Sequence, residues 1–333
     1  MKGCRIYGAI LATLCLLLLT GIRGGESYNL PDGLEIRKSG IELVDIEGET
    51  GAAETAEPEE EPFLGGAKLM LLANQSASQM LSSVIQTKDG GVIVVDGGTP
   101  ADAPHLIEVV QSMGGRVNAW LITHLHNDHV GALTTILNME QPPLEIDGIY
   151  YSIVTEDWYY ENDPTRADTA AAFIAAIQRV PEEKRHDDIR KGTTIQVADA
   201  TVTVMNKRYL FQNDSGNNAS VAYTVCVNGR YIVFLGDMGQ EAGARLLKDW
   251  NPQDLKCDII QMAHHGQGGV DEDFYRVMRP KICLWPTPQW LWDNDNGGGP
   301  GSGKWQTATT RKWMEDLGVT EHYCIKDGDQ TIL

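Results

Sequence analysis

Residues 123–129, Thr-His-Leu-His-Asn-Asp-His, constrain the chain most, because they place three imidazoles and a carboxylate directly after the apolar run 117–122. His124 and His126 are two residues apart, so on an extended or turning backbone their side chains point the same way. The carboxylate and the third imidazole can then reach a second position further along the loop. Imidazole nitrogen and carboxylate oxygen suit zinc and its first-row neighbours. The motif therefore predicts a chemically active metal site where a buried strand ends.

Three further apolar runs also end in residues that can bind or support a metal ion. Residues 92–96 end in Asp96, residues 231–237 end in Asp237, and the run 259–263 is followed by His264 and His265. Together with the H-x-H-x-D-H motif, this ordered set resembles the metallo-β-lactamase-fold hydrolases over about residues 67–333. The resemblance implies an αββα sandwich and a metal-dependent hydrolase.

The resemblance also implies roles for the individual side chains. Asp96 supports the metal loop, and Asp237 bridges two divalent ions, with zinc expected and manganese or iron as alternatives. One ion is held by His124, His126 and Asp237, and the other by Asp128, His129, Asp237 and either His264 or His265. Asp128, His264 and His265 are the expected catalytic residues, and the histidine that does not bind metal could contact substrate or donate a proton.

One part of the family pattern is missing. A third histidine is expected between the metal loop and Asp237, but the sole candidate, His186, lies in the polar run 182–188, which is typical of a solvated helix or loop. The chain instead has Asn-Asn-Ala-Ser at residues 217–220. This pattern is similar to the hydrolase domain of ComEC-type competence proteins, and it implies that Asn218, Ser220 or water completes a weaker first site or contacts substrate.

Short strand-like runs, among them residues 146–154, alternate with helical patterns along the folded part of the chain. Turns such as Asn228-Gly229 predict hairpins. Mixed hairpins and crossing helices predict two sheets with helices outside them, in one domain. The expected helices are residues 103–113, 167–180, 241–250, 273–278 and 307–317.

The chain begins differently. Residues 1–25 combine Lys2 and Arg5 with a long apolar stretch, which predicts a signal peptide or an N-terminal membrane anchor. Residues 26–62 are acidic and rich in Gly, Ala and Pro, which predicts a disordered linker. The hydrolase domain then spans residues 63–333. We expect the protein to be exported, either to the extracellular space or to the cell surface.

The charge of the chain bears on its substrate. The formal net charge is −19, and no basic stripe offsets it. Extended nucleic acid is therefore a disfavoured partner, and a small phosphodiester, such as a nucleotide or a choline phosphodiester, or a neutral molecule is preferred. The tryptophans at residues 285, 290 and 292 could stack on such a ligand or pack the helix at 307–317.

The sequence predicts hydrolysis of phosphodiester bonds by a metal-activated water. Hydrolysis of a lactone, lactam or carboxylic ester is the alternative within the same fold, and a noncatalytic surface-binding module is the alternative from another class. No protein partner is indicated. Four cysteines, at residues 226, 257, 283 and 324, lie in or beside strand-like runs, and their spacing favours buried thiols over disulfides.

Overall fold

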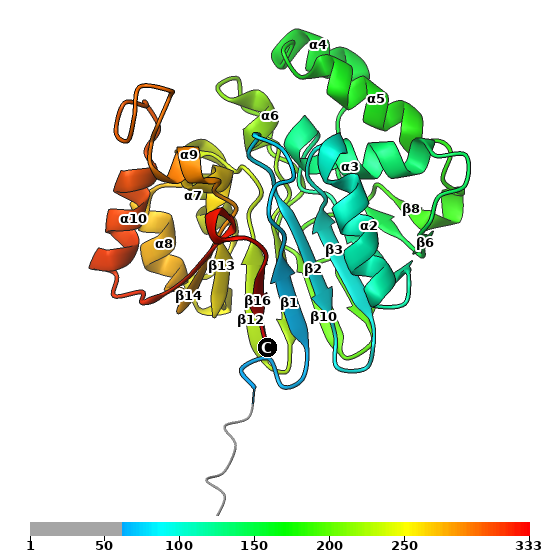
Figure 1. The fold of residues 1–333 in the computed structure, drawn as a ribbon, viewed down its shortest axis with the longest axis horizontal. Coiled ribbons are helices and arrows are strands. Elements are labelled where there is room, and N and C mark those ends of the chain that lie inside the picture. The colour runs from blue at the N-terminus through cyan, green and yellow to red at the C-terminus, as the bar shows by residue number, and fades with distance from the viewer. Residues whose placement is uncertain (1–61) are drawn as a thin grey trace, which may run out of the picture. The chain divides into compact units, whose positions relative to one another are not determined.

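The computed structural model describes residues 62–333, which form two facing β-sheets with helices on both outer sides (Figure 1). This arrangement confirms the αββα sandwich that the sequence predicts. The predicted signal or anchor and, except for Pro62, the predicted linker lie outside the described residues. Within residues 62–333, no helix is both long and apolar enough to cross a bilayer.

The first sheet has seven strands and is mixed. Its strands, in spatial order, are β16 (Gln330–Ile332), β1 (Lys68–Leu71), β2 (Ser82–Gln86), β3 (Val92–Asp96), β5 (Ala119–Leu121), β7 (Ile149–Tyr150) and β8 (Arg185–His186). The neighbours from β16 to β3 pair antiparallel, and the neighbours from β3 to β8 pair parallel.

The second sheet also has seven strands and is mixed. Its strands, in spatial order, are β15 (Glu321–Cys324), β14 (Ile282–Trp285), β13 (Ile259–Gln261), β12 (Arg230–Phe234), β11 (Tyr223–Val227), β10 (Ala200–Val204) and β9 (Thr194–Val197). The neighbours from β9 to β12 pair antiparallel, and the neighbours from β12 to β15 pair parallel. A two-stranded parallel pair, β4 (Arg116–Val117) and β6 (Glu145–Ile146), stands apart from both sheets.

The central strands are continuously apolar because both of their faces are buried. In β3, Val94 packs under the helices of the first sheet, whereas Ile93 points into the core between the sheets. In β12, Ile232 faces that central core and Val233 faces the helices of the second sheet. Because successive side chains of a strand point to opposite faces, the strands contribute to three apolar layers, one between the sheets and one under the helices on each outer side.

The five predicted helices are all present, and no end differs from the prediction by more than three residues. They are α2 (Ala103–Ser112), α5 (Ala167–Ile177), α7 (Gln240–Asp249), α8 (Glu272–Met278) and α10 (Thr307–Asp316). The prediction missed α3 (Asn127–Asn138), α4 (Glu156–Asn162), α6 (Ser215–Asn218) and α9 (Gln289–Trp292). Helices α2, α3 and α5 lie on the side of the first sheet, and α8 and α10 on the side of the second (Figure 1).

Two local predictions were wrong. The strand expected at residues 146–154 is broken into two short strands. β6 pairs with β4 and β7 pairs with β5 and β8, and the chain leaves the sheet after Tyr150. The polar run around His186 contains strand β8 rather than only helix or loop, because this segment pairs with β7 and forms the edge of the first sheet. The ring of His186 stacks on Tyr150 with centroids 4.3 Å apart.

The four described cysteines are free, as the sequence favours.

Candidate metal centre

The candidate ligands meet because they follow parallel strands, whose C-terminal ends share one edge of a sheet. Asp96 ends β3, and the histidine motif follows β5 and enters α3 at Asn127. Asp237 follows β12 of the other sheet. His264 and His265 lie in the turn Ala263–Gly266, which follows β13 after one residue, and both have left-handed rather than helical backbone angles. Both sheets therefore deliver polar side chains to the same end of the sandwich.

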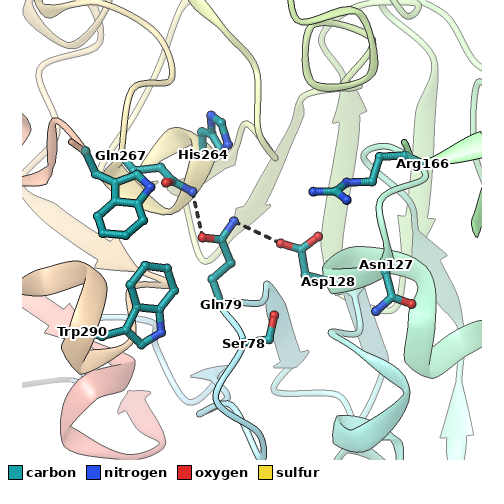
Figure 2. A pocket seen from close by; sticks show the side chains of 9 residues that line it. Ser78, Gln79, Asn127, Asp128, Arg166, His264, Gln267 and Trp290 are labelled. Atoms are coloured by element: carbon teal, nitrogen blue, oxygen red, sulfur yellow. Dashed lines mark hydrogen bonds between the residues drawn. The ribbon is translucent and has the colours of Figure 1, made fainter. Parts of the chain in front are cut away.

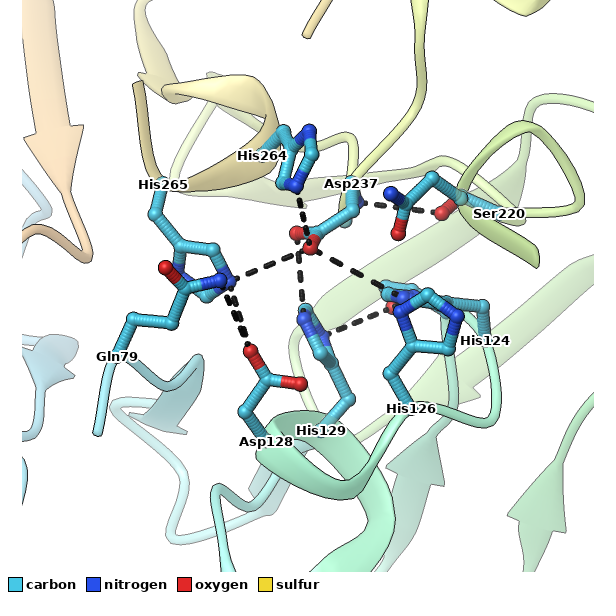
Figure 3. Close-up of polar contacts among 12 residues, drawn as sticks. Gln79, His124, His126, Asp128, His129, Ser220, Asp237, His264 and His265 are labelled. Atoms are coloured by element: carbon cyan, nitrogen blue, oxygen red, sulfur yellow. Dashed lines mark hydrogen bonds and ion pairs between the residues drawn. The ribbon is translucent and has the colours of Figure 1, made fainter. Parts of the chain in front are cut away.

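Two groups of side chains could hold metal ions, and both include Asp237. One consists of His124, His126 and Asp237, and the other of Asp128, His129, Asp237 and His265. Figure 3 shows the imidazoles gathered around the Asp237 carboxylate.

The distances agree with a shared carboxylate. The Asp237 Oδ1 atom lies 3.2 Å from Nε2 of His129, and its Oδ2 atom lies 3.3 Å from Nε2 of His265. Oδ2 also lies 4.0 Å from Nε2 of His124. The side chain is 2% exposed. Asp237 can therefore reach ions on both sides of it.

The ring nitrogen of His129 that faces away from Asp237 is held by Asp96, as the sequence predicts for a supporting carboxylate. Asp96 Oδ2 lies 2.7 Å from His129 Nδ1. The same carboxylate accepts hydrogen bonds from the backbone N–H and the hydroxyl of Thr123, at 2.8 and 2.7 Å. A partner of this kind fixes the tautomer and orientation of a metal-binding imidazole.

Strained backbone marks the site. Asp96, His264 and His265 have φ of 54°, 50° and 52°, a left-handed conformation that costs free energy for residues other than glycine. Gly236 also has a positive φ, and a Cβ there would lie 2.6 Å from the Thr123 side chain. The turn before Asp237 therefore requires glycine both for its conformation and for the close approach of the metal loop.

Gln261 was missed by the sequence prediction, and it holds the same turn. Its amide oxygen accepts hydrogen bonds from the backbone N–H groups of Leu235 and Gly236, both at 2.8 Å, and its amide donates to the Gly236 carbonyl at 3.0 Å. The side chain is completely buried. Gln261 thus positions Asp237 through the backbone.

Ser220 and Asn218 lie beside the site in supporting positions. The Ser220 hydroxyl accepts a hydrogen bond from the Asp237 backbone N–H at 3.2 Å. The Asn218 amide donates to the Asn213 carbonyl at 2.9 Å, and its oxygen accepts from the Ala242 N–H at 3.2 Å. Both ends of that amide are therefore engaged, which leaves Asn218 a structural role between α6 and α7.

The donor atoms fit divalent ions. Several buried atoms that face the centre have no hydrogen-bond partner, although buried polar atoms normally have one. They are Nε2 of His124, Nε2 of His129, Nε2 of His265 and Oδ1 of Asp237. Ligation would satisfy these atoms.

The two carboxylates of the centre favour their ionised forms. Burial alone would raise the pKa of Asp237, but the imidazoles of His129, His265 and His264 outweigh burial and hold that pKa well below its usual value. The pKa of Asp128 is also low, against the effect of its burial, chiefly because the His265 imidazole lies beside it with Nε2 3.3 Å from the Asp128 carboxylate.

The imidazoles of the site differ in the direction in which their pKa values are shifted. Burial would lower the pKa of His265, but Asp237 and Asp128 raise it to about 9, and Asp237 and Asp96 likewise raise the pKa of His129. Burial lowers the pKa of His124 and of His264. A divalent ion would take the place of the protons on His129 and His265, because ligating imidazoles must be neutral.

The structure distinguishes the two adjacent histidines. His265 is completely buried, its Nδ1 lies 3.0 Å from the Pro286 carbonyl oxygen, and its Nε2 lies 3.3 Å from both Asp128 and Asp237. His264 is 22% exposed and belongs to neither candidate metal group. His265 is therefore the one of the two that could bind a metal ion in these groups, whereas His264 faces the opening of the site.

A cavity of about 480 Å³ opens above the centre. It is lined by Ser78, Gln79, Asn127, Asp128, Arg166, His264, Gln267, Trp290 and Trp305. Figure 2 shows Arg166 on one side of it and Trp290 on the other. The Gln267 amide donates to Gln79 at 2.8 Å, and the Gln79 amide donates to Asp128 at 3.2 Å, which links the rim to a candidate ligand.

Of the tryptophans that the sequence singles out, one packs inside the fold and another lines the cavity, where a ligand could stack on it. Trp285 is completely buried and packs on Trp292, with ring centroids 5.3 Å apart. Trp290 lines the cavity, where its ring lies 5.0 Å from that of Trp305 and its indole N–H donates to the Ala77 carbonyl. Trp305 carries no such signal in the sequence, because a glycine-rich loop separates it from Trp290 and Trp292.

The family model described as the metallo-beta-lactamase superfamily matches residues 77–267, more than half of the chain. The chain belongs to this superfamily. The enzyme class that the sequence predicts, a metal-dependent hydrolase of the metallo-β-lactamase fold, is confirmed. A search of the curated proteins found no significant match.

Similar solved structures share little sequence identity with this chain. CmlA, a diiron β-hydroxylase from Streptomyces venezuelae, is 11% identical with a TM-score of 0.48, and the match covers 80% of this chain and 54% of CmlA. This chain thus spans about half the length of CmlA. YhfI from Bacillus subtilis is 11% identical with a TM-score of 0.44, and the match covers 80% of this chain and 99% of YhfI. MEM-A1, a subclass B3 metallo-β-lactamase from a soil metagenome library, is 16% identical with a TM-score of 0.38, and coverage is 75% and 90%.

Proposed function

We propose that this metallo-β-lactamase-fold enzyme hydrolyses small phosphodiesters. The observation that carries the proposal is the position of Arg166, the one arginine or lysine among the residues that line the cavity above the two candidate metal groups. Arg166 forms no ion pair with any carboxylate of residues 62–333. Its guanidinium points into the cavity toward Asp128 (Figure 2), and guanidinium groups bind phosphate oxygens well.

The chain supplies distinct functions around a bound phosphodiester. Divalent ions held by the two groups would acidify a water molecule and stabilise negative charge on the phosphate. Arg166 would hold a phosphate oxygen that faces the rim. His264 faces the cavity with a low pKa caused by burial, so its neutral ring can donate a hydrogen bond to the departing oxygen.

The size and charge of the molecule favour a small substrate. Beyond residue 62, Asp and Glu still outnumber Lys and Arg by 34 to 22, so a long polyanion would be repelled outside the cavity. The pair formed by Trp290 and Trp305 offers ring faces on which a nucleobase or another aromatic group could stack. A nucleotide-like phosphodiester thus fits better than extended nucleic acid.

We also propose the subgroup and location that the sequence predicts. The Asn-Asn-Ala-Ser pattern and the absence of a third ligand histidine support a ComEC-type enzyme, with zinc as the expected metal. Residues 1–25 support export, with the acidic linker separating the enzyme from a membrane or cell wall. These proposals are tested by metal analysis and by the location of the intact protein in fractionated cells.

The substrate class is tested with matched arginine variants. We expect the enzyme to hydrolyse bis(p-nitrophenyl) phosphate in preference to p-nitrophenyl acetate and simple lactones. R166A should reduce kcat/KM for the phosphodiester roughly 10- to 100-fold, the loss expected for a hydrogen bond to a charged group. R179A, which removes an exposed arginine beyond the end of α5, should have little effect. A preference for the carboxylic ester or lactone, with no effect of R166A, would favour the alternative hydrolase class.

A further inference from the structure

Asp163 contacts the metal centre, although nothing in the predicted ligand set includes it. Its Oδ2 atom lies 2.8 Å from Nε2 of His126, and the two side chains are 14% and 11% exposed. Asp163 caps the C-terminal end of α4, where its backbone N–H donates to the Tyr159 carbonyl at 2.8 Å. The carboxylate therefore comes from a segment far from the metal loop in sequence and is fixed in place.

The other buried imidazoles of the two groups show what such a contact does. One nitrogen of each ring is held by a neighbour, as His129 is by Asp96 and His265 is by Pro286, while the other nitrogen faces Asp237. In His126 the nitrogen that contacts a neighbour is Nε2, and this neighbour is the Asp163 carboxylate. This contact places the proton on Nε2 and leaves the lone pair of Nδ1 for a metal ion.

We infer that Asp163 is a positioning residue for the first metal site and partly replaces the missing third histidine there. The inference rests on the metal-dependent function proposed above. His186 cannot supply that histidine, because its ring stacks on Tyr150 in the first sheet and it belongs to neither candidate metal group. A carboxylate on Nε2 of His126 fixes the orientation of that ring and adds negative charge beside a site that has only two imidazoles.

Gly216 in α6 makes room for this contact. A Cβ atom at residue 216 would lie 2.1 Å from Asp163 Oδ2 and 2.4 Å from His126 Nε2. Its φ is not positive, so alanine could adopt the same backbone. Gly216 is therefore required for space, and replacing it would push Asp163 and His126 apart without removing either one.

The same turn connects the first metal site to the proposed substrate site. The Arg166 backbone N–H donates to the Asp163 carbonyl at 3.0 Å, so the residue that orients His126 and the residue proposed to bind phosphate lie in one hydrogen-bonded turn. Asp163 thereby fixes His126, which would hold the first ion, relative to the backbone of Arg166.

The test measures metal binding rather than turnover. The full chain is titrated with Zn²⁺ against a chromophoric chelator, and bound zinc is counted by elemental analysis after dialysis. D163A and G216A should weaken the lower-affinity site roughly 10- to 100-fold, as loss of a partner of a ligating histidine does, and should leave the higher-affinity site unchanged. D163N keeps an acceptor for the His126 N–H, so it should recover part of the loss. E161A, an exposed carboxylate two residues away, is the matched control and should bind two ions like the parent.

The retained second ion shows that each variant is folded. Two ions bound as tightly in D163A and G216A as in the parent would overturn the inference, and so would equal weakening of both sites. The titration contains no phosphodiester, so a failure of the proposed substrate class would leave its outcome intact.

Discussion

Asp237 is the residue on which both candidate metal groups depend, because its carboxylate belongs to each of them. The substitution D237N keeps the volume of the side chain and removes its charge. We expect D237N to lose at least one bound ion and to reduce kcat/KM on the order of 100-fold or more, since removal of a shared ligand disturbs both sites. Elemental analysis and turnover of bis(p-nitrophenyl) phosphate measure the two effects.

D254N, which changes an exposed carboxylate outside the site, is the control for D237N and should behave like the parent. Full metal content and activity in D237N would contradict the shared-ligand assignment.

The low pKa of Asp258, a residue outside the candidate metal centre, makes the free energy of unfolding depend on pH. Burial would raise its pKa, but the Lys281 ammonium and the Tyr231 N–H, at 2.8 and 3.0 Å, together with Arg230, lower it. The folded chain therefore binds this proton less readily than the unfolded chain. The stabilisation is complete above about pH 4, the ordinary value for aspartate, and is lost as the pH falls through the lower folded pKa.

We expect D258N to lower the free energy of unfolding by about 1–3 kcal/mol at pH 7, the range for hydrogen bonds to a charged group. The difference from the parent should shrink as the pH falls below about 4. Urea titrations across this range measure it. A difference that is constant with pH would show that the charge of Asp258 contributes nothing.

Helix α3 shows what the sequence concealed at the level of elements. It begins inside the metal motif and contains Gly131, Thr134 and Thr135, residues with low helix propensity. The helix forms because its apolar side chains, among them Val130 and Leu133, are buried against the neighbouring helices of the first sheet. Tertiary packing thus overrides local preference, and this information is absent from a local pattern.

The close packing of α3 predicts a cost for enlarging Gly131. A Cβ there would lie 2.4 Å from Cδ of Pro100 and 2.7 Å from its nitrogen. We expect G131A to lower the free energy of unfolding by about 1–3 kcal/mol, the usual cost of overpacking. N138A, on the exposed end of the same helix, is the control. Urea unfolding that is identical for G131A and the parent would mean that the contact relaxes without cost.

Across the whole molecule, the sequence predicted the residues that follow buried strands better than those that approach from elsewhere. Each strand and its terminal ligand candidate form one local signal, as in β3 with Asp96 and β12 with Asp237. Asp163 and Gln79 carry no such signal, because they reach the centre through segments brought together only by folding. For the same reason, the sequence could not distinguish His264 from His265, whereas burial and distances do.

The sandwich was predictable because both faces of its central strands are apolar. The helices that the prediction missed lie mostly at the end of the sandwich that carries the metal centre. There, polar and glycine residues serve the site and weaken the helical pattern, as in α6 with Gly216. Function and local structural preference conflict at this end of the molecule.

We propose that divalent ions, held by the two residue groups that share Asp237, supply the activated water for hydrolysis. The most direct test is elemental analysis of the purified full chain, paired with turnover of bis(p-nitrophenyl) phosphate before chelation, after chelation and after metal is restored. We expect about two ions per chain by the family resemblance, turnover that is lost with the ions, and recovery when zinc or manganese is returned. Turnover that persists in metal-free protein, or a chain that binds no ion, would contradict the account.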